Sequence, residues 1–164
     1  MLVGALILPG CGDEQTSAVG TAKGAPTTRA DETLGGANAA VAAASHQGAA
    51  QCRRAMGDFL DAMESLSNSV AVGVSYDGYL TAVNHVRASY ASIQAERLPL
   101  LCLARVAAPA ERALNAYIET VNTWGDCLAT TSCDPESIEL ELQRRWTQAA
   151  DGLSRVQANL RNLR

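Results

Sequence analysis

The side chains best suited to chemistry in this 164-residue chain are its five cysteines and two histidines. Four cysteines lie in the patterned part of the chain and could either bind a metal as thiolates or pair as disulfides: Cys52, Cys102, Cys127 and Cys133. The chain has no Cys-x-x-Cys, and neither His46 nor His85 has ligand spacing from a cysteine, which argues against zinc. An even number of cysteines is typical of disulfides in an exported protein, and four cysteines allow three pairings.

Motifs for catalysis are missing from the sequence. It contains no His-Glu-x-x-His, no Gly-x-Ser-x-Gly, no phosphate-binding loop and none of the Glu-x-x-His pairs of di-iron bundles. The one weak candidate is an apolar-ligand site, because His85, Tyr79 and Tyr90 carry side chains that could ligate a non-covalent haem. Helix packing also explains the tyrosines. We therefore predict a protein that is not an enzyme, without metal or cofactor, and keep a carrier of an apolar ligand such as haem as an alternative.

The chain opens on ten uncharged residues, MLVGALILPG, followed by Cys11. A transmembrane helix needs about 20 apolar residues, so this run fits the apolar part of a secretory signal peptide better. The stretch LPGC, residues 8–11, resembles the lipobox of bacterial lipoproteins. The resemblance implies cleavage before Cys11 and acylation of that cysteine, with two or more acyl chains giving a stable anchor. No Lys or Arg precedes the apolar run, so we expect the start codon to lie further upstream.

The residues after the apolar run are typical of a flexible linker. Residues 12–45 are rich in Gly, Ala and Thr and show no periodicity. As a coil of about 34 residues, this stretch would reach roughly 30 to 35 Å. Residues 39–44 could extend the next helix backward, because alanine is the best helix former. We thus expect a signal peptide at 1–10, a lipidated cysteine and linker at 11–45, and a folded domain at 46–164.

The domain has a helical pattern throughout. Apolar residues recur at steps of three and four, the period of an amphipathic helix. They form four stripes, which run from Cys52 to Val70, from Tyr76 to Ile93, from Ala110 to Leu128 and from Leu142 to Leu163. Because no segment alternates as a strand would, the sequence predicts an all-α four-helix bundle in up-down-up-down order, with a three-helix bundle and a disordered first segment as the alternative.

Local signals place the links between these helices. The turn VGVSYDG separates the first two, and Pro99 and Pro109 bound a connection with one short helix around residues 100–106. Pro109 suits the first turn of the following helix. Asp134 and Pro135 are the expected cap and first residue of the last helix.

An up-down bundle selects one disulfide pairing. It places Cys52 and Cys102 at one end and Cys127 and Cys133 at the other, whereas helices of about 20 residues are about 30 Å long. Disulfide partners need Cα atoms within about 7 Å. We therefore predict the pairs Cys52–Cys102 and Cys127–Cys133.

The net charge and two short sequence fragments indicate which binding partners to expect. The net charge of -4 indicates neither a nucleic-acid footprint nor a polybasic patch for an anionic membrane. LNAY at 114–117 and QRRW at 143–146 resemble fragments of small helical periplasmic lysozyme-inhibitor-type domains, and this resemblance makes a periplasmic enzyme inhibitor a second alternative.

We expect an exported lipoprotein held by its lipid anchor on the bacterial cell membrane or outer membrane, acting by binding an envelope protein rather than by catalysis. Gly12 after the cysteine favours the outer membrane, as the lipoprotein resemblance implies. A binding face would lie on an outer helix surface or on the link at 98–108, whose apolar stretch LPLLCLARV we expect to pack mostly under the bundle.

Overall fold

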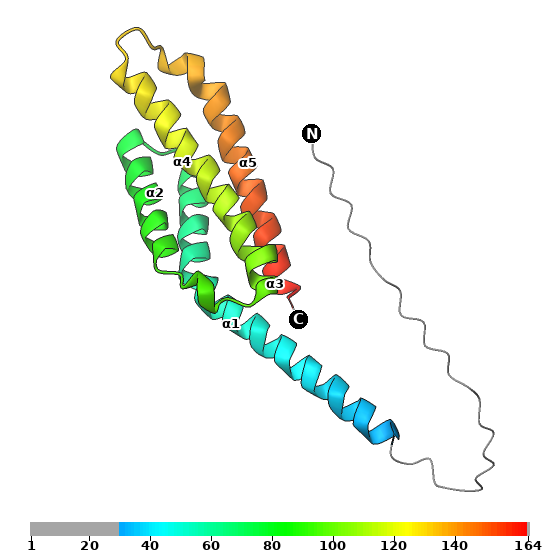
Figure 1. Ribbon diagram of the computed structural model, residues 1–164. Coiled ribbons are helices and arrows are strands. Elements are labelled where there is room, and N and C mark those ends of the chain that lie inside the picture. The colour runs from blue at the N-terminus through cyan, green and yellow to red at the C-terminus, as the bar shows by residue number, and fades with distance from the viewer. Residues whose placement is uncertain (1–29, 164) are drawn as a thin grey trace, which may run out of the picture.

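The computed structural model describes residues 30–163, and all regular structure in this range is helical (Figure 1). Four long helices carry the fold: α1 (Ala30–Val72), α2 (Tyr76–Ala91), α4 (Ala108–Ala129) and α5 (Pro135–Arg161). Three short pieces connect α2 to α4: η1 (Ala95–Arg97), α3 (Leu100–Cys102) and the π-helical turn η2 (Leu103–Ala107). This confirms the all-α class and the four helices.

Helix α1 is longer than predicted. It begins at Ala30, so residues 30–45 of the expected flexible linker are helical. The alanine-rich run at 39–44 accounts for this difference, because alanine has the most favourable helix propensity of all residues. The extension projects beyond the other helices (Figure 1). Ala49 is the first residue of α1 with a described side chain that is buried. The predicted signal peptide and Cys11 lie outside the described residues.

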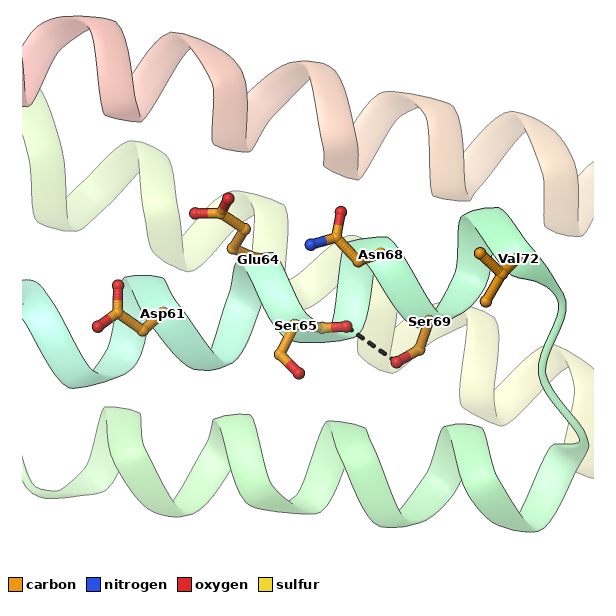
Figure 2. Close-up of a pocket in the computed structure, with 6 residues that line it drawn as sticks. All are labelled: Asp61, Glu64, Ser65, Asn68, Ser69 and Val72. Atoms are coloured by element: carbon orange, nitrogen blue, oxygen red, sulfur yellow. Dashed lines mark hydrogen bonds between the residues drawn. The ribbon is translucent and has the colours of Figure 1, made fainter.

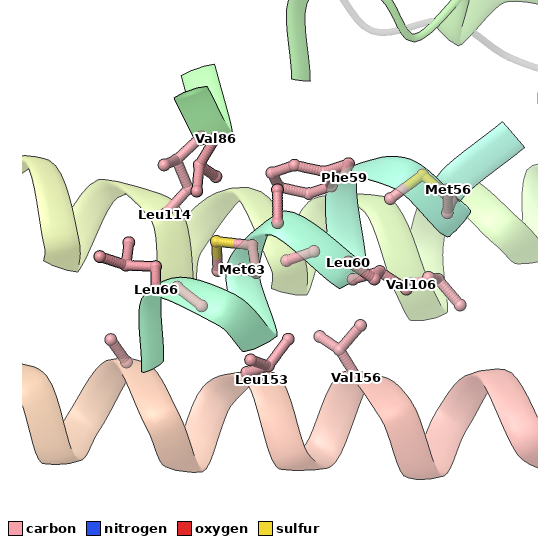
Figure 3. Close-up of a cluster of buried hydrophobic side chains, with 14 of the residues drawn as sticks. Met56, Phe59, Leu60, Met63, Leu66, Val86, Val106, Leu114, Leu153 and Val156 are labelled. Carbon is pink, nitrogen blue, oxygen red and sulfur yellow. The ribbon is translucent and has the colours of Figure 1, made fainter. Parts of the chain in front are cut away.

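The apolar stripes of the sequence meet in one core (Figure 3). Met56, Phe59 and Met63 of α1 face Val86 of α2 and Leu114 of α4. Leu153 and Val156 of α5 close the core from the remaining side. Each buried side chain of this size contributes about 1.5–3 kcal/mol by leaving water, so this core is the main source of stability.

Capping residues set where α2 and α5 begin. The Ser75 hydroxyl accepts a hydrogen bond from the Gly78 N–H at 3.3 Å, and the Asp134 carboxylate accepts one from the Glu136 N–H at 3.1 Å. Pro135 is the first residue of α5, as predicted. Gly73, between α1 and α2, has a φ of 95°, a conformation that glycine adopts without a Cβ penalty.

Pro109 lies in the first turn of α4, as predicted, and a π-helical turn, which the sequence does not predict, joins α3 to α4 into one helical run. Pro109 has no N–H, so the carbonyl of Arg105 four residues earlier lacks its usual helical donor. Asn159 of α5 donates to that carbonyl at 2.9 Å instead. The proline is thereby tolerated inside a continuous helical stretch, and the freed carbonyl ties α5 to the link.

Both predicted disulfides are present. Cys52 of α1 pairs with Cys102 of α3, with Cα atoms 5.6 Å apart, and Cys127 of α4 pairs with Cys133 before α5, with Cα atoms 5.2 Å apart. The first joins segments 50 residues apart, and the second closes the link between α4 and α5.

The bundle has two ends, which we name by their contacts. At the basal end, Cys52 bonds to Cys102 and the Gln51 side chain donates to the Arg97 carbonyl at 2.7 Å. At the distal end, the link between α1 and α2 lies beside the start of α5. Within residues 30–163, no helix has an apolar run long enough to cross a bilayer.

Candidate functional site

Four aromatic side chains from three helices gather at the distal end. Tyr76 and Tyr79 of α2, Trp124 of α4 and Trp146 of α5 have neighbouring ring centroids 5.6 to 6.1 Å apart. These are the distances at which edge-to-face and tilted pairs attract. Tyr76 also requires a glycine, because a Cβ at Gly125 would lie 2.5 Å from its hydroxyl oxygen.

Tyr79 lies at the buried centre of this aromatic cluster. Its side chain is fully buried, and its hydroxyl donates to the Tyr117 carbonyl at 2.9 Å. Burial raises the pKa of Tyr79, and the nearby polar groups of Trp146 and Thr120 offset a part of that rise. Burial likewise raises the pKa of Tyr117, with the Ser67 hydroxyl acting against it. Both phenols stay neutral at physiological pH and serve as packing groups.

Two polar atoms of this region have unused hydrogen-bonding capacity. Within residues 30–163, the Tyr117 hydroxyl and the Trp146 indole nitrogen are buried without a hydrogen-bond partner. Such atoms are rare in folded proteins, because an unpaired buried polar group costs about 1–3 kcal/mol. The indole belongs to a side chain that also lines an open groove, so the aromatic cluster reaches the surface at Trp146.

This groove, about 340 Å³ in volume, lies where the link between α1 and α2 meets α4 and α5. Val70, Val74 and Leu142 form apolar walls beside the two indole rings. Glu136 and Glu139, both exposed, stand on its edge. We call it the distal groove. It combines an apolar, aromatic wall with a negative rim, an arrangement suited to binding rather than to proton transfer.

The charges around the distal groove are mostly negative. Its rim belongs to a half of the bundle, residues 61–83 and 115–148, in which Arg144 and Arg145 are the only basic residues. Arg145 is engaged by Glu119 at 2.8 Å and by Glu141 at 2.6 Å. The charge of Arg145 is therefore already balanced, and Glu136 and Glu139 form no salt bridge with a side chain of residues 41–163.

A larger hollow of about 560 Å³ follows the outer face of α1 between α2 and α5 (Figure 2). All its lining residues come from α1, with Asp61 and Glu64 one turn apart. Glu64 accepts a hydrogen bond from Gln157 of α5 at 3.0 Å, and the Ser69 hydroxyl donates to the Ser65 carbonyl. Asp58, Asp61 and Glu64 are exposed, and no second helix contributes a residue to the lining of this hollow.

The three weak ligand candidates do not converge. His85 is exposed on α2, whereas Tyr79 is buried on the opposite, core-facing side. Tyr90 packs on Phe59 at a centroid distance of 5.3 Å, and burial together with the neighbouring Glu111 raises its pKa. These positions give no common cavity for a haem. Within residues 30–163, no three His, Cys, Asp or Glu side chains gather in a way that could hold a metal ion.

The distal groove was missed by the sequence reasoning. The spacing of Trp124 and Trp146 indicates only that both lie on core-facing stripes. Their partial exposure depends on how the link at Gly73 and Val74 sits against α5, which periodicity does not contain.

Comparisons with known proteins give no relative from which to argue. No protein-family model, no curated protein and no solved structure matches this chain. The function must therefore be argued from its own residues.

Proposed function

We propose that this protein is a membrane-anchored, non-catalytic binding module of the bacterial cell envelope, and that the distal groove is its binding site. The observation that carries the proposal is the pairing of Trp124 and Trp146 along a groove with Glu136 and Glu139 on its rim. A site for catalysis would bring an acid, base or nucleophile from several elements to one point. This groove brings together aromatic and apolar surface instead.

The chemistry of the groove selects a class of partner. Its apolar walls favour an apolar side chain, and its unpaired carboxylates favour a cation. Indole faces also attract a guanidinium or ammonium group by about 0.5–1 kcal/mol at exposed sites. The partner is thus a protein segment that presents arginine or lysine next to an apolar residue. Inhibition of a basic envelope enzyme is one form that this binding would take.

Anchoring and export are supported by separate observations. The stretch LPGC resembles a lipobox, and the two disulfides are typical of proteins in oxidising compartments. Intact mass spectrometry of the protein expressed from its native gene tests both. We expect a chain beginning at Cys11 with acyl chains attached, and a mass increase on reduction that matches two disulfides. An unacylated chain that retains residues 1–10 would overturn the anchor.

We also infer the up-down-up-down order for the four helices. Short links support it, because three residues separate α1 from α2 and five separate α4 from α5. The side-by-side contacts of α1 with α2, α2 with α4, α4 with α5 and α5 with α1 agree with it. Residues 11–29 of the predicted linker lie outside the described residues.

Site-specific crosslinking tests the distal groove. A photo-reactive benzoylphenylalanine replaces Glu139 at the rim in cells that make the native lipoprotein. The control carries the same group at Ser154, an exposed position nearer the other end of the same helix. We expect a discrete protein adduct from position 139 and none from position 154.

Rim charge gives the second readout. Glu136→Gln in the crosslinking protein should lower the adduct yield severalfold, since a rim charge steers association and supplies part of the affinity. Asp151→Asn, which removes an exposed charge outside the groove, serves as the matched control. Equal adducts from positions 139 and 154, or yields that do not respond to Glu136→Gln, would contradict the proposal.

A further inference from the structure

The basal end of the molecule is basic, whereas the distal end is acidic. The basal half of the bundle comprises residues 46–60, 84–114 and 149–163. All its arginines are exposed: Arg53, Arg54, Arg87, Arg97, Arg105, Arg112, Arg155 and Arg161. Its carboxylates are fewer: Asp58, Glu96, Glu111 and Asp151. The net charge of -4 therefore averages a basic end and an acidic end.

Two leucines project from this basic end. Leu100 is 82% exposed and Leu101 is 54% exposed, although their neighbours Leu98 and Cys102 are buried. They border an apolar hollow of about 250 Å³, whose other wall is formed by Ala44 and Gly48 of α1. The link therefore packs under the bundle only in part, less than predicted, because its first helical turn presents Leu100 and Leu101 to solvent.

The arginines near these leucines are free to act on a ligand. Arg97 and Arg105 flank the leucines in sequence, and each receives a side-chain hydrogen bond at its backbone carbonyl rather than at its guanidinium. Arg53 donates to the carbonyl of Leu160 in α5 and to that of Leu163 just after α5, both at 3.5 Å. None of these three guanidinium groups forms a salt bridge with a side chain of residues 41–163.

The extension of α1 leaves the bundle at this same end (Figure 1). From residue 33 to residue 57 the chain contains no Asp or Glu, and Val41 is 70% exposed. The part of the extension nearest the bundle, residues 33–45, therefore adds no negative charge to the basic end, and Asp31 and Glu32 lie at the far end of the extension. The extension, the two exposed leucines and the basal arginines therefore belong to the same end of the bundle.

We propose that the basal end docks on an anionic lipid surface, with Leu100 and Leu101 inserted between headgroups and the surrounding arginines bound to lipid phosphates. Each arginine near an anionic membrane is worth about 1 kcal/mol, and long basic side chains reach the headgroups while apolar neighbours insert. Docking in this orientation points the acidic distal groove away from the membrane. The proposal goes beyond the proposed function, because it requires neither the acyl anchor nor the groove.

Flotation with lipid vesicles tests this surface on protein that has no acyl chains. The protein is the full chain with Cys11→Ala, mixed with vesicles of phosphatidylcholine alone or of phosphatidylcholine with phosphatidylglycerol. We expect binding to the second kind only, weakened by added salt. Arg97→Gln together with Arg105→Gln should weaken binding roughly thirtyfold, which corresponds to two arginines at about 1 kcal/mol each.

Matched variants distinguish insertion of the two leucines from non-specific binding to vesicles. Leu100→Ser with Leu101→Ser should weaken binding at least about tenfold, because two leucines then no longer leave water. Leu140→Ser and Arg144→Gln, at exposed positions of the distal half, should leave binding unchanged. Circular dichroism confirms that each variant is folded.

Three results would overturn the proposal. The first is equal binding to both kinds of vesicle, and the second is an equal loss of vesicle binding in the basal and the distal variants. The third is an oligomer that forms without vesicles and dissociates when the basal residues are substituted. The last would assign the basal end to the acidic end of a second copy of the chain. None of these results bears on the crosslinking at Glu139, so the two proposals fail separately.

Discussion

At the scale of single residues, the buried tyrosine Tyr79 has the most specific consequence. Its hydroxyl is one of the few buried polar groups of the core with a hydrogen-bond partner on another helix, the Tyr117 carbonyl of α4. Burial raises the pKa of Tyr79 above its ordinary value of 10.0, so the folded state holds this proton more tightly than the unfolded state does. Stability that depends on a raised pKa is fully present below the pKa of the unfolded state and is lost as the pH rises through the pKa of the folded state.

Tyr79→Phe makes this dependence measurable. At pH 7 the variant should be less stable by about 1 kcal/mol, the net worth of one hydrogen bond. Above about pH 10 the wild type loses about 1.4 kcal/mol of stability per pH unit through this group, and the variant does not. The two stabilities should therefore meet near about pH 11 in urea titrations followed by tryptophan fluorescence. A difference that stays constant from pH 7 to 11 would contradict a perturbed Tyr79.

At the scale of elements, the two parts of α1 differ in what holds them. Residues 52–70 pack against three other helices, whereas the side chains at 41–44 are exposed. An isolated helix of about 12–15 residues is marginal in water even when it is rich in alanine. The extension is thus helical by propensity, and the rest of α1 is helical by packing.

Amide hydrogen exchange distinguishes the two parts. We expect amides at 41–45 to exchange at least about a hundredfold faster than those at 56–66, because opening the extension exposes no core. The measurement is exchange followed by mass spectrometry on overlapping peptides, with α5 residues 149–156 as the protected reference. Similar protection along all of α1 would mean that the extension is covered in solution.

Sequence reasoning works best for elements and least well for their surfaces. The spacing of the apolar stripes predicted the helices, and Asp134 with Pro135 predicted where α5 begins. Both signals are local, because they depend on periodicity along one segment and on hydrogen bonds between neighbouring residues. The π-helical turn before Pro109 was not predicted, because the Asn159 side chain that satisfies the freed Arg105 carbonyl comes from a distant helix. The groove at Trp146 was missed for the same kind of reason, since it is formed where separate elements meet.

At the scale of the whole molecule, the two disulfides add to the stability that the core provides. In the chain-entropy model, closing a loop of 50 residues is worth about 4 kcal/mol and closing one of 6 residues about 2 kcal/mol. Cys52→Ala with Cys102→Ala should thus lower the free energy of unfolding by about 2 kcal/mol more than Cys127→Ala with Cys133→Ala. Chemical denaturation of both double variants and the wild type measures this difference. Equal losses would show that strain or packing, rather than loop length, determines the effect.

Charge polarity is also a property of the whole molecule and could not be read from composition. Along the helices, arginines concentrate in the basal half and carboxylates in the distal half. The two charges offset one another in the net charge of the chain, which therefore does not reveal the polarity. Only the packing of the helices side by side collects the arginines at one end and most of the carboxylates at the other. A prediction from sequence would have needed the helix ends and their order before counting charges.

The continuity of α1 has a mechanical consequence. A tensile load applied to residue 30 travels along one uninterrupted helix and reaches the folded domain near Ala49, three residues before Cys52. There the covalent bridge to Cys102 divides the load between α1 and the helical run that continues into α4. The non-covalent packing of residues 56–66 is thereby shielded, so the first structure to yield under tension is the exposed extension, which can lengthen without unfolding the domain.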